Sequence, residues 1–197
     1  MKHFYYLPKF EEEWFDYQNL YTDMVNTFPT GSVFVEVGSW KGRSAAYMCV
    51  EIANSNKLID FYCIDSWPYC DDDGIEVYDK FLNNLKPVEQ YFKSFKLNSV
   101  DAASMFEDNS IDFVFIDAGH DYDSVRADIL AWYPKVKKGD IIAGHDYFLN
   151  HPVLKDVYTV VNELFPNNHS RIETTDHTFS RAIDQTGGYC FLKYKTE

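Results

Sequence analysis

The sequence predicts an α/β fold built on a doubly wound, mostly parallel sheet of seven strands. Short apolar runs rich in β-branched residues alternate with stretches of helical periodicity, which is typical of βα units. The run VFVEV at Val33–Val37 enters a glycine turn and then a small-residue helix, as at the opening of a Rossmann-like fold. Two late apolar runs predict a closing strand pair, with an antiparallel C-terminal strand at the edge of the sheet.

The apolar pattern places the elements in chain order. Residues 1–30 form a helical N-terminal extension, with its helix from about residue 9 to 28. The apolar face of that helix holds Trp14, Phe15, Leu20 and Val25. We expect strands at Val33–Val37, Phe61–Asp65, Phe95–Leu97, Ile111–Asp117, Gly139–Tyr147, Ser170–Thr174 and Tyr189–Tyr194. We expect helices at 44–54, 77–85, 101–106, 123–132 and 153–164, with Asp121 or Asp123 capping the fourth. The length of 197 residues suits one domain, 1–197.

The composition limits the partners. The net charge is −13 and no lysine or arginine cluster is present, which argues against a nucleic-acid substrate because phosphate binding needs a positive surface. No apolar run approaches a membrane span, and no signal peptide is recognisable. The four cysteines lack CxxC or zinc spacing. We expect a cytoplasmic protein with a small-molecule substrate and no membrane partner, and a homo-oligomer stays open.

The glycine turn after the first strand indicates a cofactor site. Gly38 and Gly42 are spaced GxxxG, which is neither the dinucleotide fingerprint GxGxxG nor the phosphate loop GxxxxGK[ST]. The acid Glu36 stands near the end of the same strand. A glycine turn with an acid suits a cofactor that has hydroxyls, an amine and a positive charge but no phosphate, such as S-adenosylmethionine. The alternative is a tight turn without a ligand.

Asp65 ends the second predicted strand, 23 residues after Gly42. That spacing is close to the one at which an acid binds ribose hydroxyls in nucleotide folds. A carboxylate at this place can accept hydrogen bonds from both hydroxyls. The alternative is that Asp65 is a helix cap or a turn acid.

Acids and histidines also follow the fourth and fifth predicted strands. Asp117, His145 and Asp146 could hold a divalent metal, because the carboxyl ends of parallel strands meet at one edge of the sheet. Histidine is a poor ligand for Mg²⁺ and suits Mn²⁺, Fe²⁺ or Zn²⁺ better. The alternative is that His145 is a hydrogen-bonded pocket histidine and only the acids matter.

His120 lies three residues after Asp117, in the loop above the predicted sheet. An imidazole titrates near neutral pH, so we expect His120 to be the general base. The alternative is a helix-start histidine that contacts Asp121 or Asp123.

Four segments together resemble the class I S-adenosylmethionine-dependent methyltransferases, and more closely the metal-dependent O-methyltransferases that act on macrolide sugars, such as the macrocin and mycinamicin enzymes. The segments are VEVGSWKGRSA, FYCIDSW, IDFVFIDAGHDYDSVRADI and GDIIAGHDY, and they lie within residues 33–147. The resemblance implies an O-methyltransferase assisted by Mg²⁺ or Mn²⁺. We expect its acceptor to be a small hydroxylated molecule, such as a sugar or a vicinal diol.

The resemblance also implies roles for single residues. The implied contacts to S-adenosylmethionine are Glu36 and Gly38 at the methionine end, Asp65 at the ribose, Ser99, Val100 and Asp101 beside the adenine, and also Gly42 and Asp117. The implied metal ligands are Asp117, Asp146 and, where the sugar enzymes have an acid, His145. The implied base is His120. The chain is short for the sugar enzymes, so the acceptor cannot be carried over.

Two other functions stay open from the sequence. A nicotinamide-dependent oxidoreductase would also use a Rossmann sheet, but the absence of GxGxxG argues against it. A non-catalytic member of the same fold would keep the cofactor pocket without turnover.

Overall fold

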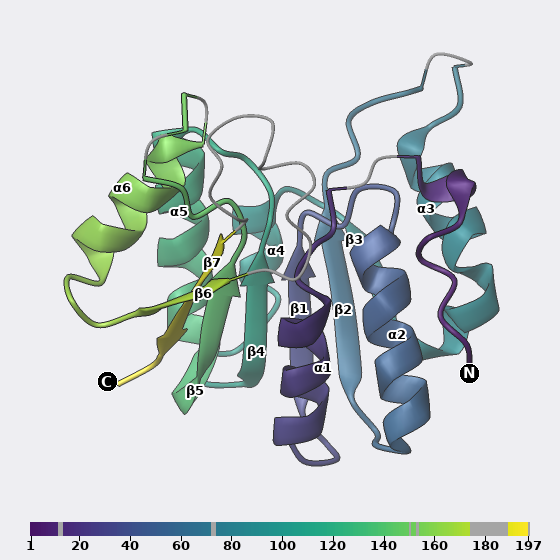
Figure 1. The fold of residues 1–197 in the computed structure, drawn as a ribbon, viewed down its shortest axis with the longest axis horizontal. Coiled ribbons are helices and arrows are strands. Elements are labelled where there is room, and N and C mark those ends of the chain that lie inside the picture. The colour runs from purple at the N-terminus through teal and green to yellow at the C-terminus, as the bar shows by residue number, and fades with distance from the viewer. Residues whose placement is uncertain (12–13, 72–73, 150, 153, 174–188, 197) are drawn as a thin grey trace.

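A seven-stranded sheet lies between two layers of helices (Figure 1). The structure, a computed structural model, describes residues 1–11, 14–71, 74–149, 151–152, 154–173 and 189–196. The strands are β1 Val33–Val37, β2 Asp60–Asp65, β3 Lys93–Lys96, β4 Ile111–Ile116, β5 Val136–Gly144, β6 Ser170–Glu173 and β7 Tyr189–Tyr194. The α-helices are α1 Gln18–Thr27, α2 Arg43–Ser55, α3 Val77–Leu85, α4 Ser99–Ala103, α5 Tyr122–Trp132 and α6 Lys155–Leu164. Short 3₁₀ helices are η1 Pro8–Phe10, η2 Lys86–Tyr91 and η3 Tyr133–Lys135.

The strand order is β3-β2-β1-β4-β5-β7-β6. The first five strands pair in parallel, and β7 pairs antiparallel with both β5 and β6. This confirms the predicted parallel sheet with an antiparallel C-terminal strand pair. The chain order reverses between β1 and β4, which are neighbours in the sheet, and ligands of open α/β sheets bind at such a point beyond the carboxyl ends of the strands.

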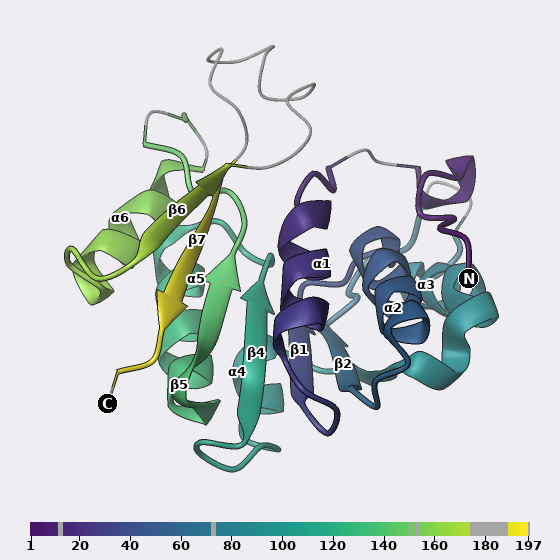
Figure 2. The same cartoon turned by 60° about the horizontal axis from the view of Figure 1, so that its bottom comes forward.

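The sheet has a separate core on each face. Helices α1, α2 and α3 cover one face, and α4, α5 and α6 cover the other (Figure 2). Successive side chains of a strand point to opposite faces, so Phe113 and Phe115 of β4 join the first core while Val114 and Ile116 join the second. All six residues of β4 are buried, as expected for a central strand. Among the described helices, none combines the length and the apolar character that a membrane crossing requires.

Three expectations about the elements are corrected. The helix expected at 101–106 begins earlier and spans Ser99–Ala103, because Asn98 caps it by accepting from the backbone N–H of Val100. The fifth strand begins at Val136 and ends at Gly144, earlier than expected at both ends. Its end comes early because the backbone turns at Asp146 with a φ of +58°. The N-terminal helix begins only at Gln18, and Trp14, which was placed on its apolar face, lies outside the helix with 55% of its surface exposed. Of the two predicted caps of α5, Asp121 is the one that accepts from the backbone, at Ser124.

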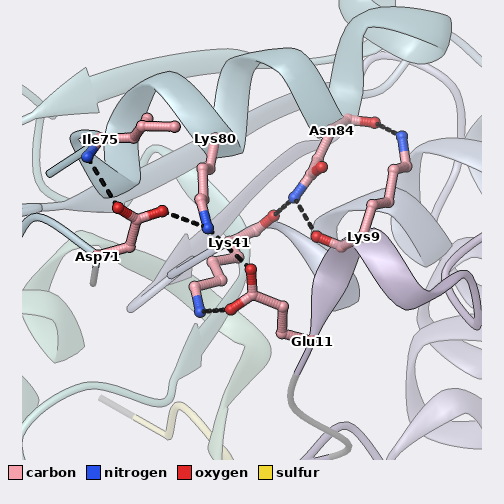
Figure 3. Close-up of polar contacts among 7 residues, drawn as sticks. All are labelled: Lys9, Glu11, Lys41, Asp71, Ile75, Lys80 and Asn84. Carbon is pink, nitrogen blue, oxygen red and sulfur yellow. Dashed lines mark hydrogen bonds and ion pairs between the residues drawn. The ribbon is translucent and has the colours of Figure 1, made fainter. Parts of the chain in front are cut away.

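Figure 3 shows how the segment before α1 is fastened to the glycine turn and to α3. Glu11 pairs with the buried Lys41 of the turn and with Lys80 of α3, and Lys80 also pairs with Asp71. Asn84 of α3 donates a hydrogen bond of 2.9 Å to the carbonyl oxygen of Lys41. These contacts bring the N-terminal segment across the carboxyl edge of the sheet, beside the predicted cofactor turn.

Candidate functional site

Glu36 lies in β1 just before the glycine turn, with 1% of its surface exposed. Tyr21 of α1 donates a hydrogen bond of 2.6 Å to Glu36 Oε2. Within the described residues, Glu36 Oε1 and the hydroxyl of Ser39 are buried without a hydrogen-bond partner. Burial raises the pKa of Glu36 to about 7, because the surroundings disfavour the charged form. A carboxylate oxygen and a hydroxyl that are buried without a hydrogen bond of good geometry among the described residues fit a ligand that brings N–H donors and positive charge.

Gly38 makes the glycine turn possible. Its φ is +92°, and a Cβ at this place would lie 1.8 Å from the carbonyl oxygen of Asp117. Any side chain would therefore push the turn away from the residue that follows β4. Gly42, with a φ of +85°, precedes α2 directly, and a Cβ there would meet Phe81 and Leu85 of α3 at 3.0–3.1 Å. Gly38 therefore lets the predicted cofactor turn lie against Asp117, and Gly42 lets the start of α2 pack on α3.

Asp65, the last residue of β2, accepts hydrogen bonds from the backbone of two turns, at Trp40 and at Trp67. Its Oδ2 accepts from the backbone N–H of Trp40 at 2.9 Å, and its Oδ1 accepts from that of Trp67 at 2.8 Å. Burial raises the pKa of Asp65 above its ordinary value. The alternative of a turn acid is thus present in the structure. Each carboxylate oxygen can accept a second bond, and the ribose contact stays a prediction.

The three residues expected beside the adenine differ in their surroundings, and Val100 is exposed in α4. Ser99 begins α4, and its hydroxyl accepts a hydrogen bond of 2.9 Å from the indole of Trp132, so it is engaged with α5. Asp101 is exposed in the first turn of α4. Their roles toward a cofactor stay predictions.

An acid–histidine cluster of Asp117, His120 and Asp146 stands at the carboxyl ends of β4 and β5. Asp117 follows β4 and Asp146 lies just beyond β5, and the parallel register places Ile116 beside Gly144. One ligand atom from each of the three residues lies within 4.8 Å of the other two. Two carboxylates and an imidazole form a donor set that Mn²⁺ accepts readily. The structure thus gathers His120 into the set for which His145 was expected.

The surroundings of His120 differ from those of a free base. Its Nε2 lies 2.8 Å from Asp146 Oδ2 and 4.0 Å from Asp117 Oδ1, and it has no hydrogen bond of good geometry among the described residues. The two carboxylates raise the pKa of His120 to about 10. An imidazole that is already protonated at neutral pH cannot accept a proton. The carboxylates thus favour the protonated ring in the cation-free protein, and the base role of His120 stays a prediction.

His145 lies beside the cluster and contacts Asp16 of the segment that precedes α1. Its Nε2 is 2.9 Å from Oδ1 of Asp16, which lies 129 residues away in the sequence. Its Nδ1 is 3.3 Å from Asp146 Oδ1 and 3.9 Å from Asp117 Oδ1. Burial works against the charged form, but the three carboxylates outweigh it and raise the pKa of His145. The alternative of a hydrogen-bonded pocket histidine matches this geometry, and the ligand role stays a prediction.

Sequence reasoning missed the residues that the N-terminal segment brings to the site: Asp16, Tyr17 and Tyr21. Tyr17 donates a hydrogen bond of 3.0 Å to Asp117 Oδ2 and packs on Phe115, with ring centroids 4.4 Å apart. Burial, followed by the charges of Asp117 and Glu36, raises the pKa of Tyr17, so its hydroxyl stays a donor. The spacing of four between the tyrosines indicates one helix face, but nothing local in the sequence reveals which strand ends they meet.

Comparison with known proteins places the chain. A family model described as a methyltransferase domain matches residues 35–147, more than half of the chain. The protein y4gI of Sinorhizobium fredii, which carries no description of function, is 24% identical over 115 residues. That match covers 57% of this chain and only 13% of y4gI.

Solved structures share the fold at low sequence identity. An rRNA methylase from Streptococcus thermophilus has a TM-score of 0.62 at 10% identity, over 91% of this chain and 95% of that one. SMU.1697c from Streptococcus mutans, in complex with SAH, has a TM-score of 0.61 at 11% identity, over 88% and 94%. The O-methyltransferase TomG from Streptomyces achromogenes, in complex with SAM, has a TM-score of 0.61 at 12% identity, over 90% and 79%. These similarities support the fold and leave the acceptor undetermined.

Proposed function

Because the chain belongs to the methyltransferase-domain family, we propose that it is an S-adenosylmethionine-dependent O-methyltransferase for a small hydroxylated molecule, assisted by a divalent cation. The observation that carries the proposal is the direct contact between two halves of the site. The glycine turn at Gly38 packs on the backbone of Asp117, which is itself part of the acid–histidine cluster. A methyl donor held by the turn and an acceptor held by the cluster would therefore be neighbours.

The cofactor half suits S-adenosylmethionine in charge and in hydrogen bonding. Glu36 Oε1 and the Ser39 hydroxyl offer unpartnered acceptors for an amino group. Asp65 keeps the capacity to accept from ribose hydroxyls while it fixes the turns on either side. The chain lacks the fingerprints that bind pyrophosphate or nucleotide phosphates. These features support a cofactor with amine and hydroxyl groups and no phosphate.

The acceptor half suits a cation held by Asp117, His120 and Asp146. Asp117 and Asp146 supply the negative charge, and His120 supplies a nitrogen that lies within ligand distance of both carboxylates. Tyr17 holds one oxygen of Asp117 and leaves the other toward the histidines. A histidine in the set favours Mn²⁺ over Mg²⁺.

The chemistry asks little of the protein beyond alignment. S-adenosylmethionine supplies a methyl group that its positive sulfonium already activates, so the site must place an acceptor oxygen in line with it. A divalent cation held by Asp117 and Asp146 would supply positive charge that lowers the pKa of an acceptor hydroxyl, so that its proton can leave to water as the methyl group is transferred. Asp117 and Asp146 orient that charge beside the glycine turn, and the acidic surroundings tolerate the sulfonium.

Charge and cysteine usage support the rest of the proposal. The net charge of −13 favours a small acceptor, such as a sugar or a vicinal diol, over a nucleic acid. The thiols of Cys49, Cys63 and Cys190 are free and buried, which suits a reducing cytoplasm.

The test is methyl transfer from S-adenosylmethionine to a panel of sugars and vicinal diols, with SAH formation as the readout. Each acceptor is paired with its methylated form as a control, and an rRNA fragment is included. We expect transfer to a diol, loss of transfer after exhaustive chelation, and recovery with Mn²⁺ or Mg²⁺. Full activity after chelation would refute the cation, and transfer to RNA alone would refute the small-molecule acceptor.

A further inference from the structure

Asp16 reaches the site from the segment that precedes α1. Its side chain is mostly buried, with 14% exposed, and its Oδ1 lies 2.9 Å from His145 Nε2. The next residue, Tyr17, bonds Asp117, and its ring packs on His145 with centroids 4.9 Å apart. Two consecutive residues of the N-terminal segment thus contact two residues at the ends of β4 and β5. All four residues lie outside the helices and strands, in the segments that precede α1 and follow β4 and β5.

The carboxylate of Asp16 determines which nitrogen of the His145 ring carries a hydrogen and which nitrogen faces the acids. An ionised carboxylate only accepts hydrogen bonds, so the hydrogen of that bond belongs to Nε2. The ring is then fixed with Nδ1 toward Asp146 and Asp117, at 3.3 and 3.9 Å. A metal-binding histidine commonly donates its other ring N–H to a carboxylate in this manner, which sets the tautomer and the orientation of the ring.

We propose that Asp16 is a positioning residue that holds His145 with Nδ1 turned to the cation shared by Asp117 and Asp146. The inference rests on the cation of the proposed function and adds to it. It makes the N-terminal segment part of the cation site, and it gives His145 a place in the ligand set next to His120. Asp16 itself touches neither cation nor substrate and acts through the ring of His145.

The experiment measures Mn²⁺ binding by titration calorimetry to the full chain in the absence of acceptor. The variants are Asp16→Ala, which removes the acceptor of the Nε2–H bond, and Asp16→Asn, which keeps a carbonyl oxygen there. The matched control is Asp23→Ala, the same change at an exposed aspartate of α1. We expect Asp16→Ala to weaken Mn²⁺ binding by about 10–100-fold, Asp16→Asn to recover much of it, and Asp23→Ala to match the wild type.

Two further readouts separate positioning from a structural role. SAH affinity should stay within about twofold in Asp16→Ala, because the 2.9 Å contact that this variant removes is with His145 beyond β5 and not with Glu36 or Asp65. In a His145→Gln background, Asp16→Ala should cost nothing more in Mn²⁺ affinity, as expected for two residues that act as one unit. If Asp16→Ala does not fold, Asp16→Ser takes its place, because the shorter hydroxyl falls short of Nε2.

The outcomes distinguish the absence of a bound cation from the absence of a positioning role for Asp16. A wild-type chain that binds no Mn²⁺ refutes the proposed cation and the inference with it. A wild-type chain that binds Mn²⁺, together with an Asp16→Ala variant that binds it equally well, refutes the inference alone. An equal loss of Mn²⁺ affinity in the wild-type and His145→Gln backgrounds shows that Asp16 does not act through His145.

Discussion

Replacing Glu36 by glutamine should stabilise the ligand-free protein at pH 8. The pKa of Glu36 rises from 4.5 to about 7 on folding, so the folded state binds a proton that the unfolded state has released between these values. The free energy of unfolding therefore falls as the pH rises from about 4.5 to 7, and above pH 7 the full cost remains. At about 1.4 kcal/mol per pKa unit, this cost is about 3 kcal/mol.

Glutamine removes that cost but adds a smaller one. Its carbonyl oxygen can still accept from Tyr21, while its amide N–H groups need partners beside Ser39, at a cost of up to about 1 kcal/mol. We expect a net gain of about 2 kcal/mol at pH 8, most of which develops between pH 5 and 7. The assay is urea unfolding of both proteins at pH 5, 6, 7 and 8, with Glu89→Gln at an exposed site as the control. A Glu36→Gln variant whose stability relative to the wild type does not change with pH would refute the buried-acid argument.

Two further predictions concern the two halves of the site. Asp65→Ala should weaken SAH binding by about 1.5–3 kcal/mol, as for a lost hydrogen bond to a charged group. Asp65→Asn should weaken it less. Unchanged SAH affinity in a folded alanine variant would assign Asp65 to the turns at Trp40 and Trp67 alone. His120→Ala should weaken Mn²⁺ binding by at least about tenfold and leave SAH binding unchanged. If the variant instead keeps Mn²⁺ and loses about 10²–10⁴-fold in turnover, His120 is the base and not a ligand.

Much of the fold was predictable because the sheet is buried on both faces. β1, α3 and β7 have the predicted bounds, and β4 was the clearest apolar run of the chain. The start of β5 was missed because Lys137 and Lys138 are polar and read as a loop. Of the missed residues, Val136 pairs with Ile111 of β4, before the register of the two strands shifts. The N-terminal helix was predicted too long because Phe15 and Tyr17, which precede Gln18, are buried although they lie outside the helix. The apolar pattern of this segment was interpreted as the apolar face of a helix.

The site was predictable as far as strand ends determine it. Parallel strands align their carboxyl ends, so the gathering of Asp117 and Asp146 followed from the pattern. How the two histidines are arranged around these acids did not follow, because Asp146 takes a positive φ beyond the end of β5, and because Asp16 contacts His145 from 129 residues away. Contacts between segments so distant leave no periodic signal in the sequence.

The central claim is tested most directly by the choice of cofactor. The measurement is the thermal unfolding of the purified chain with SAH and, separately, with NAD, each at a hundredfold excess over its dissociation constant or at the highest soluble concentration. We expect SAH to stabilise the fold by about 2.7 kcal/mol at that excess, seen as a higher unfolding temperature, and NAD to leave that temperature unchanged. Stabilisation by NAD with none by SAH would contradict the methyltransferase account and favour a nicotinamide-dependent oxidoreductase.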